Sequence, residues 1–391
     1  MRSLPPVKQI RKGVLVAIVF WINFLLLSIR MKNAVKKAVI LVAGRGSRIR
    51  PLTYAYPKGL VGVFDKPAIH YLIDELKEVG IQDIIIVISR NQTQFQKYIQ
   101  KVKPESAWRT LNFRFTTQKK LRGSADALLT AQKFIKEEPF IVFFCDDLLH
   151  SSVSPTKTSI KIFESKKGFI LTLYEVPKHL IQRWGIVSVK KMGKDLYKIK
   201  DIVEKPKPEE APSSIGSIGR FILTPRIFPF IKETEKIFKN KKEVAIADAL
   251  KLYLQKGGDV YGWKFRGQHF DTGSKTGLLK AQIYFGLQNN EFKKEIRKYL
   301  NTCLKSKLDK LKEYGVIATS GLSNLNKKDL LVLQKQINAK LSSGQRDFIL
   351  WHAISVLSEA IKVHHALELL ETQGIYPLYT YIESIFSSAS K

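Results

Sequence analysis

The sequence predicts an α/β fold, a doubly wound, Rossmann-like mixed sheet with an α-helical extension at its C-terminal side. Short aliphatic runs such as Lys37–Gly44 (KAVILVAG) and Asp83–Arg90 (DIIIVISR) alternate with segments of helical spacing, which is typical of strands buried on both faces. Beyond about residue 288 the chain is charged and lacks strand patterns. With 391 residues, 45% hydrophobic and 26% charged, it can form at least two packed domains.

The first half of the chain repeats strand and helix in a regular order. Pro67–Gly80 (PAIHYLIDELKEVG) has apolar residues at helical spacing, proline at its start and glycine at its end. The elements expected after Asp83–Arg90 are a helix near Gln92–Gln100, a strand at Leu111–Gln118, a helix at Ser124–Lys136 and a strand at Pro139–Asp147. Short loops between such elements predict a mostly parallel sheet. Ligands of such sheets bind at the carboxyl ends of the strands, where we expect Gly44 and Asp146-Asp147 to face one cleft.

The second half is expected to add a more mixed region and then helices alone. The expected elements are strands within Phe169–Val189, at Leu196–Val203 and at Ile218–Leu223, a helix at Val244–Gln255, and helical blocks at Glu291–Ile337 and Asp347–Ile385. We therefore expect three parts: a basic and apolar segment over residues 1–36, an α/β domain over 37–287, and a helical extension of unknown role over 288–391.

The segment Val14–Ile29 (VLVAIVFWINFLLLSI) is apolar and flanked by Lys and Arg. Three interpretations stay open. It is an anchor in the inner face of the cell membrane, slightly shorter than the roughly 20 residues of a spanning helix; a signal peptide that lacks a good cleavage site; or sequence upstream of a natural start at Met31. The chain is otherwise expected in the cytoplasm, because Cys145 and Cys303 provide no disulfide framework.

The net charge of +32 suggests an anionic ligand, nucleic acid or lipid. A lysine-rich proteome or a high-salt cell interior explains the charge equally well, so charge alone does not decide the function. We do not expect nucleic acid as the partner, and we expect a homo-oligomer.

The first apolar strand leads into a loop of glycine and arginine, Gly44-Arg45-Gly46-Ser47-Arg48. A tight turn with two glycines offers backbone N–H groups to phosphate oxygens. The third glycine of the dinucleotide-binding fingerprint is absent, since Ile49 stands there, while Arg48 and Lys58 supply positive charge. This pattern favours a nucleoside triphosphate over a generic dinucleotide site.

These residues belong to a longer pattern that resembles the sugar-phosphate nucleotidyltransferases, closest to bacterial and archaeal UDP-glucose pyrophosphorylase. The matching motifs are Ala43–Arg48, Pro51, Pro57-Lys58, Asp65–Pro67, Trp184–Val187, Val203–Pro208, Ile218–Leu223 and Phe270–Gly273. They lie in order and at suitable spacings from about Lys37 to Leu287. The resemblance implies that a sugar 1-phosphate and a nucleoside triphosphate form a nucleotide-sugar and pyrophosphate, without a protein nucleophile.

The resemblance also implies a role for individual residues. Those expected to bind the nucleotide are Ala43, Gly44, Gly46, Ser47, Gln118 and Gly123. Those expected to bind the sugar phosphate are Gly185, Glu204, Lys205 and Gly219. Arg48 would grip the β- and γ-phosphates, Lys58 would bridge the reacting phosphates, and Lys205 would hold the sugar phosphate. Asp146 and Asp271 would hold Mg²⁺, a cation that prefers oxygen ligands.

Simpler interpretations accompany several of these roles. Asp147 could replace Asp146 as the metal ligand, or both could cap a turn. Glu204 and Lys205 could form an ordinary surface ion pair, and Gln118 could be an ordinary polar residue at a strand end.

The sequence departs from the UDP-glucose pyrophosphorylase pattern in three segments, Gly59–Gly62, Arg122–Ala127 and Val244–Asp248. UTP with glucose 1-phosphate is the expected pair; the alternatives are other pairs such as dTTP with glucose 1-phosphate, GTP with mannose 1-phosphate or an ADP-glucose type. A regulatory protein that binds nucleotide-sugar without turnover, and a nucleic-acid-binding protein, are the two further hypotheses.

The C-terminal extension gives few functional signals. Ala360–Tyr381 resembles a helical segment of archaeal DNA-repair helicases, but the chain contains no Walker lysine loop. His352, His364 and His365 lack partner cysteines or carboxylates, so a packing role is expected for them.

Overall fold

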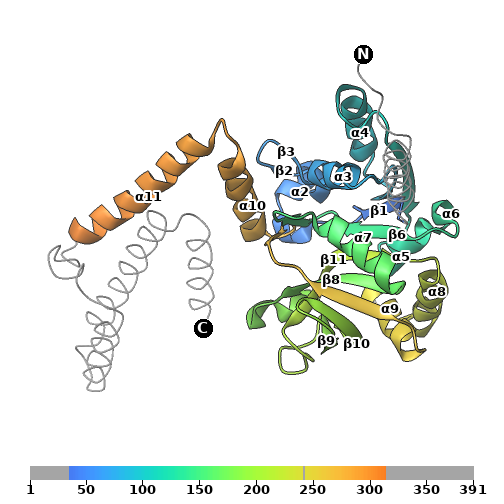
Figure 1. Ribbon diagram of the computed structural model, residues 1–391. Helices are drawn as coiled ribbons and strands as arrows, with labels where there is room; N and C mark the ends of the chain where they lie inside the picture. Colours follow the sequence, from blue (N-terminus) through green and yellow to red (C-terminus); the bar gives the residue numbers. More distant parts are fainter. Residues whose placement is uncertain (1–34, 241–242, 314–391) are drawn as a thin grey trace, which may run out of the picture. The chain divides into compact units, whose positions relative to one another are not determined.

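The computed structural model describes residues 35–240 and 243–313, with side chains described up to residue 303 (Figure 1). The apolar run Val14–Ile29 and the C-terminal histidines lie outside the described residues. Among the helices that the structure describes, none combines the length and the apolar character that crossing a membrane requires.

Thirteen strands and ten α-helices are described. The strands are β1 (Lys37–Leu41), β2 (Gly62–Val63), β3 (Lys66–Pro67), β4 (Asp83–Ser89), β5 (Asn112–Gln118), β6 (Phe140–Phe144), β7 (Asp147–His150), β8 (Phe169–Glu175), β9 (Gly185–Lys191), β10 (Leu196–Glu204), β11 (Ile215–Leu223), β12 (Val260–Lys264) and β13 (Gln268–Asp271). The α-helices are α2 (Leu52–Ala55), α3 (Ala68–Glu78), α4 (Gln94–Glu105), α5 (Ser124–Thr130), α6 (Gln132–Ile135), α7 (Pro155–Lys166), α8 (Ile227–Ile237), α9 (Ile246–Gln255), α10 (Lys275–Gln288) and α11 (Lys293–Glu313). Short 3₁₀ helices lie at Ser47–Ile49, Lys58–Leu60 and Lys178–Arg183.

A nine-stranded mixed sheet organises the α/β domain, in the order β5-β4-β1-β6-β11-β8-β12-β10-β9. The first four strands are parallel, and Val39 in β1 lies opposite Ile85 in β4 and Val142 in β6. From β11 onward most neighbours are antiparallel, with β8 and β12 as the parallel exception. The prediction of a mixed α/β sheet is confirmed.

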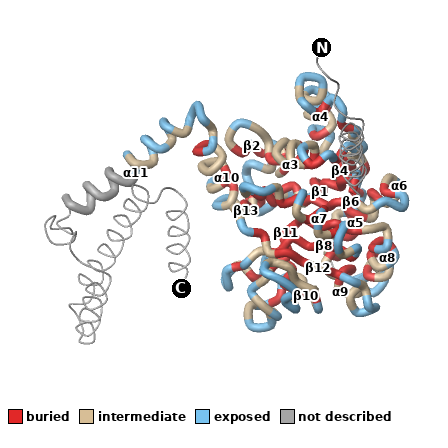
Figure 2. The backbone as a smooth tube through the Cα atoms, viewed as in Figure 1, coloured by how far each residue is buried: buried red, intermediate tan, exposed pale blue. Residues whose placement is uncertain are grey.

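The sheet is buried on both faces, as Figure 2 shows by the red strands at the centre of the domain. Along β1, Val39 and Leu41 belong to a core cluster that also contains buried residues of α5, α8 and α9. Ala38 and Ile40 point to the other face and are also fully buried. This alternation explains why the strands read as continuous apolar runs in the sequence.

Several boundaries differ from the sequence prediction. The expected strand Pro139–Asp147 ends at Phe144, and the chain then turns into β7, which leaves the large sheet and pairs with β13. The expected helix Ser124–Lys136 is divided at Ala131 into α5 and α6. At this break the Thr116 hydroxyl of β5 donates a hydrogen bond to the Thr130 carbonyl.

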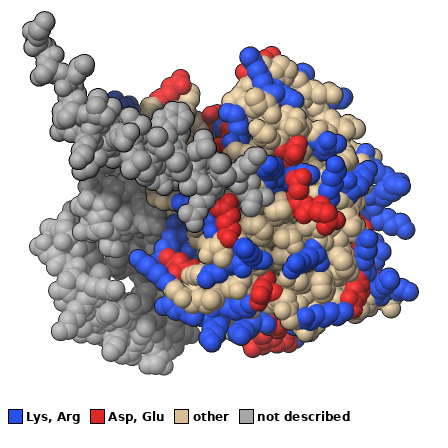
Figure 3. Space-filling model, turned by 45° about the vertical axis from the view of Figure 1, so that its right-hand side comes forward, with Lys and Arg blue, Asp and Glu red and all other residues tan. Residues whose placement is uncertain are grey.

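The chain divides into two compact units, residues 1–282 and 283–391. In the second unit, α11 agrees with the expected charged helical pattern over the residues that the structure describes. Figure 3 shows Lys and Arg side chains spread over the visible face of the described residues, with Asp and Glu side chains lying among them. That face does not present a single segregated basic patch.

Candidate active site

The loop after β1 is shaped by two glycines that lie against later parts of the chain. Gly46 has a left-handed backbone (φ 62°), and a Cβ atom there would lie 2.6 Å from Cγ2 of Thr53. A Cβ atom on Gly44 would lie 3.3 Å from Cε of Lys58. The Thr53 hydroxyl donates a 2.9 Å hydrogen bond to the Gly46 carbonyl. The loop is therefore closed against the segment that carries Lys58, and other residues would not fit easily at Gly46.

Two cavities adjoin at the carboxyl ends of the parallel strands. The first, called here the loop cavity, has a volume of about 510 Å³; it is lined by Ala43, Gly44, Gly46, Ser47 and Gln118, among others. The second, called here the Trp184 cavity, has a volume of about 840 Å³; it is lined by Trp184, Gly185, Glu204, Lys205, Gly219 and Asp271, among others. Together they contain every site residue that the sequence predicted.

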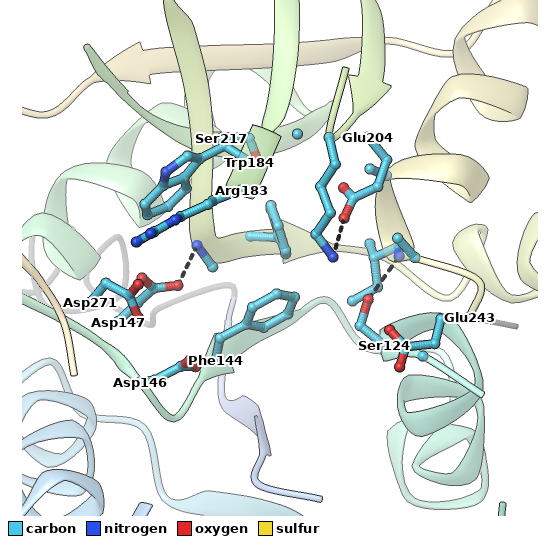
Figure 4. A pocket seen from close by; sticks show the side chains of 18 of the residues that line it. Ser124, Phe144, Asp146, Asp147, Arg183, Trp184, Glu204, Ser217, Glu243 and Asp271 are labelled. Atoms are coloured by element: carbon cyan, nitrogen blue, oxygen red, sulfur yellow. Dashed lines mark hydrogen bonds and ion pairs between the residues drawn. The ribbon is translucent and has the colours of Figure 1, made fainter. Parts of the chain in front are cut away.

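The two cavities share part of their walls. The residues that line both are Arg48, Lys58, Gly123, Ser124, Phe144, Asp146 and Glu243. In the Trp184 cavity, shown in Figure 4, the three aspartates 146, 147 and 271 lie on one side of Phe144 and Glu204 lies on the other. If each cavity held a ligand, the two ligands would therefore meet beside the charged side chains of the shared wall.

Two cations and two carboxylates form a compact cluster on that wall. Nζ of Lys58 lies 2.7 Å from Oδ2 of Asp146. The guanidinium of Arg48 lies 2.8 Å from Oδ2 of Asp271 and 3.5 Å from Oδ2 of Asp146. Arg48 thus contacts the carboxylates expected to hold a metal, and its side chain remains about half exposed. These contacts hold Asp146, in the turn between β6 and β7, close to Asp271, at the end of β13.

The cluster perturbs the protonation of its members. Burial alone would raise the pKa of Asp146, but Lys58 and Arg48 outweigh it and lower that pKa below its ordinary value. Burial would lower the pKa of Lys58, yet Asp146 and other negative groups raise it above the ordinary range. For Asp271, burial and then the charge of Asp146 raise the pKa despite Arg48. Burial and the neighbouring carboxylate therefore outweigh the Arg48 contact at Asp271.

The cysteine beside this cluster is not a candidate nucleophile. Cys145 is buried, and burial raises the pKa of its thiol to about 12. A thiolate is the reactive form of cysteine, so Cys145 is unreactive at neutral pH.

Asp147 has a different environment from that of Asp146. Its Oδ2 accepts a 3.0 Å hydrogen bond from the Gly219 N–H, and its Oδ1 lies 2.8 Å from Nε2 of His269. The Asp147 side chain is only 9% exposed. Its carboxylate therefore connects β7 to β11 and β13, whereas the Asp146 carboxylate faces the cations.

The remaining predicted residues occupy the two ends of the site. Glu204 and Lys205 lie at the end of β10, with Nζ of Lys205 3.4 Å from Oε1 of Glu204. Lys205 has a left-handed backbone (φ 51°), which is uncommon for a residue with a side chain and often accompanies functional sites. In the loop cavity, Gln118 donates from Nε2 to the Gly123 carbonyl at 2.9 Å and to Oδ2 of Asp126 at 2.8 Å.

Sequence reasoning missed four residues that the structure brings to the site: Asp126, Ser124, Glu243 and His269. Asp126 and Ser124 lie in the segment identified only as a departure from the family pattern. Glu243 reaches the cavities because the Val244 N–H donates to the Arg122 carbonyl and so holds its segment beside the start of α5. The contacts that place Glu243 and His269 join segments about 120 residues apart and leave no local signal in one sequence.

Comparison with known proteins agrees with this geometry. The family described as nucleotidyl transferase matches residues 37–285. The chain belongs to this nucleotidyl transferase family. The second unit has a separate likeness, since residues 292–391 match a family described as the helical bundle of an ATP-dependent RNA helicase.

Individual relatives of this chain are named as uridylyltransferases. UTP–glucose-1-phosphate uridylyltransferase of Staphylococcus haemolyticus is 33% identical over 283 residues, covering 68% of this chain and 97% of the relative. The Staphylococcus epidermidis protein of the same name is 30% identical with the same coverage.

Solved structures give the same result for the fold. A UDP-glucose pyrophosphorylase complexed with UDP-glucose superposes with a TM-score of 0.61 at 31% identity, covering 65% of this chain and all of the other. A UTP-bound enzyme from Acinetobacter baumannii has a TM-score of 0.58 at 28% identity, covering 68% of this chain and 98% of the other. The nucleotidyltransferase assignment made from the sequence is confirmed.

Nucleotidyltransferases of this kind generally use a divalent metal, and the residues present fit one. Among the described residues there is no cluster of three or more His, Cys, Asp or Glu side chains suited to a metal. A cation held by Asp146 and Asp271 would therefore depend on substrate oxygens and water for its other ligands, which is common for Mg²⁺. The Arg48 guanidinium contacts both carboxylates, so both already face one positively charged group.

Proposed function

We propose that this nucleotidyltransferase joins UTP to glucose 1-phosphate and releases pyrophosphate and UDP-glucose. The observation that carries the proposal is the pair of adjoining cavities with Arg48, Lys58 and Asp146 on their shared wall. The relatives named for UTP and glucose 1-phosphate support the choice of substrates. The same relatives disfavour a purely regulatory protein.

The nucleotide belongs in the loop cavity. Backbone N–H groups of the turn from Gly44 to Ser47 suit phosphate oxygens, and Gln118 lines the same cavity. Glucose 1-phosphate belongs in the Trp184 cavity, where Glu204 accepts hydrogen bonds from sugar hydroxyls and Lys205 pairs with the phosphate. Gly185 and Gly219 line this cavity without filling it.

The reaction then takes place beside the shared wall. A phosphate oxygen of glucose 1-phosphate attacks the α-phosphorus of UTP, and the bond from that phosphorus to the bridging oxygen breaks, so that pyrophosphate leaves. Lys58, held as an ammonium by Asp146, neutralises charge on the reacting phosphates. Arg48 exchanges its contact with Asp271 for one with the β- and γ-phosphates. Positioning and charge neutralisation supply the rate enhancement.

We assign Mg²⁺ to Asp146 and Asp271, with Asp147 in a structural role. When bound, Mg²⁺ would neutralise the triphosphate and the developing charge on the transferred phosphate. The proposed boundary of the catalytic domain remains at residues 37–287.

Pyrophosphate release tests this proposal. The full chain with Mg²⁺ is assayed with each of the four ribonucleoside triphosphates and dTTP against several sugar 1-phosphates. We expect the UTP and glucose 1-phosphate pair to have the highest kcat/KM, and Lys58→Met to reduce it at least about 100-fold. Turnover confined to another pair would contradict the substrates, and release from no pair would contradict the reaction.

A further inference from the structure

The side-chain amide of Gln118 is held in one orientation by two acceptors. Nε2 donates one hydrogen bond to the Gly123 carbonyl (2.9 Å) and one to Oδ2 of Asp126 (2.8 Å). A primary amide has two N–H donors and one carbonyl acceptor. A backbone carbonyl and a carboxylate both require donors, so these partners fix which end of the amide is nitrogen.

The carbonyl end of Gln118 is left for a ligand. No described residue donates a hydrogen bond to Oε1 of Gln118. This oxygen is also not a buried atom that lacks a partner. Gln118 is 4% exposed and lines the loop cavity. The fixed amide therefore offers an acceptor, and no donor, to whatever binds beside it.

We propose that Asp126 is a specificity-determining positioning residue that selects uracil over cytosine by fixing the Gln118 amide. This inference rests on the proposed function, in which a pyrimidine occupies the loop cavity. Uracil presents an N–H at position 3, which donates to Oε1 of Gln118. Cytosine presents a lone pair at the same ring atom, so the two acceptors face one another and the site rejects it.

Asp126 acts through Gln118 and need not touch the nucleotide. If the amide turned over to present Nε2 to cytosine, Oε1 would face the Asp126 carboxylate and the Gly123 carbonyl. Two hydrogen bonds would be lost, one of them to a charged acceptor, which is the stronger kind. Asp126 lies in the first turn of α5, and a carboxylate there also stabilises the helix. A purely helical role would change stability without changing the choice of base.

Equilibrium binding of UTP and CTP to the full chain tests the inference without requiring turnover. With Mg²⁺ present and no sugar phosphate, calorimetry gives the ratio of the two dissociation constants. We expect wild type to prefer UTP and Asp126→Ala to reduce that preference at least about tenfold, chiefly by tighter CTP binding, because one charge-assisted hydrogen bond no longer holds the amide. Asp126→Asn should act in the same direction, since asparagine can donate to Oε1 as well as accept from Nε2.

Asp259→Ala is the matched control, because it removes a carboxylate that pairs with Lys198 away from both cavities. It should leave the UTP-to-CTP ratio unchanged. A ratio unchanged in both Asp126 variants, with melting curves that show folded protein, would overturn the inference, as would a wild type that binds both nucleotides equally. Failure of the proposed function is separate: it is the absence of pyrophosphate release from UTP and glucose 1-phosphate while UTP still binds.

Discussion

At the scale of single residues, Asp271, which we propose as a metal ligand, shows how a buried carboxylate beside another one affects stability. Its pKa is raised by burial and by the neighbouring charge of Asp146. The folded protein thus binds this proton more tightly than the unfolded chain does, so stability falls as pH rises through the ordinary and then the raised pKa. At neutral pH the ionised carboxylate opposes folding.

Asp271→Asn is therefore expected to raise the Tm of the metal-free protein at pH 7 while it reduces kcat/KM at least about 100-fold. Thermal melts with and without Mg²⁺ and UTP, together with the pyrophosphate assay, provide the measurement. The ligand-dependent rise in Tm should be smaller in the variant than in wild type. If the metal-free variant had a lower Tm than wild type, the prediction would be wrong. The contact between Arg48 and Asp271 would then stabilise the protein more than the neighbouring carboxylates destabilise it.

Most residues of the site could be predicted from sequence, because the glycine loop, Lys58 and the Glu204-Lys205 pair lie in contiguous motifs. The immediate partners of these residues could not. Nothing adjacent to Gln118 indicates that Asp126 fixes its amide, since the contact depends on how α5 lies beside β5. Nor does a run of two aspartates show which one faces the cations and which one is used within the fold.

At the scale of secondary structure, three strands are held together by the Asp147 carboxylate. Asp147 in β7 accepts from the Gly219 N–H in β11 and contacts His269 in β13. Gly219 has no room for a side chain, since a Cβ atom would lie 2.4 Å from Oδ2 of Asp147. Because β13 also carries Asp271, this connection positions both predicted metal ligands.

Asp147→Asn is expected to lower stability by about 1–3 kcal/mol, because an amide can accept from only one of the two partners and loses the charge. Urea unfolding measures this change, and activity measured over a series of Mg²⁺ concentrations should show a raised metal requirement. Asp147 thus contrasts with Asp271, whose loss of charge is expected to stabilise the protein. Unchanged stability and an unchanged Mg²⁺ requirement would rule out this structural role.

The ends of the helices and strands were harder to predict than their presence, because the ends depend on contacts with distant parts of the chain. The aliphatic run before Asp146 indicates a strand correctly, but its end is set by the pairing of β7 with β13, more than 100 residues later. The division between α5 and α6 occurs where Thr116 of β5 binds the Thr130 carbonyl. In both places a tertiary contact competes with a local pattern that would otherwise continue.

At the scale of the whole molecule, the described residues that form the candidate active site all belong to the first compact unit. Every described residue that lines the loop cavity or the Trp184 cavity lies between residues 41 and 273. The nucleotidyl transferase family matches residues 37–285, and the second likeness begins at residue 292. The second unit therefore supplies none of the described lining residues of either cavity.

We accordingly expect a shortened chain of residues 1–288, which retains α10, to keep kcat and KM for UTP and glucose 1-phosphate within about threefold of the full chain. The physical reason is that its charged cluster, both cavities and the sheet that supports them remain intact, while binding and chemistry require only those parts. Steady-state kinetics of the two chains at equal active-site concentration make the comparison, with Lys58→Met introduced into each as a matched inactive control.

A folded shortened chain that loses activity more than about tenfold would show that the second unit contributes to catalysis, either directly or through assembly of the subunits. Sedimentation of both chains would then separate these causes, because loss of assembly changes the mass of the particle and loss of a direct contact does not.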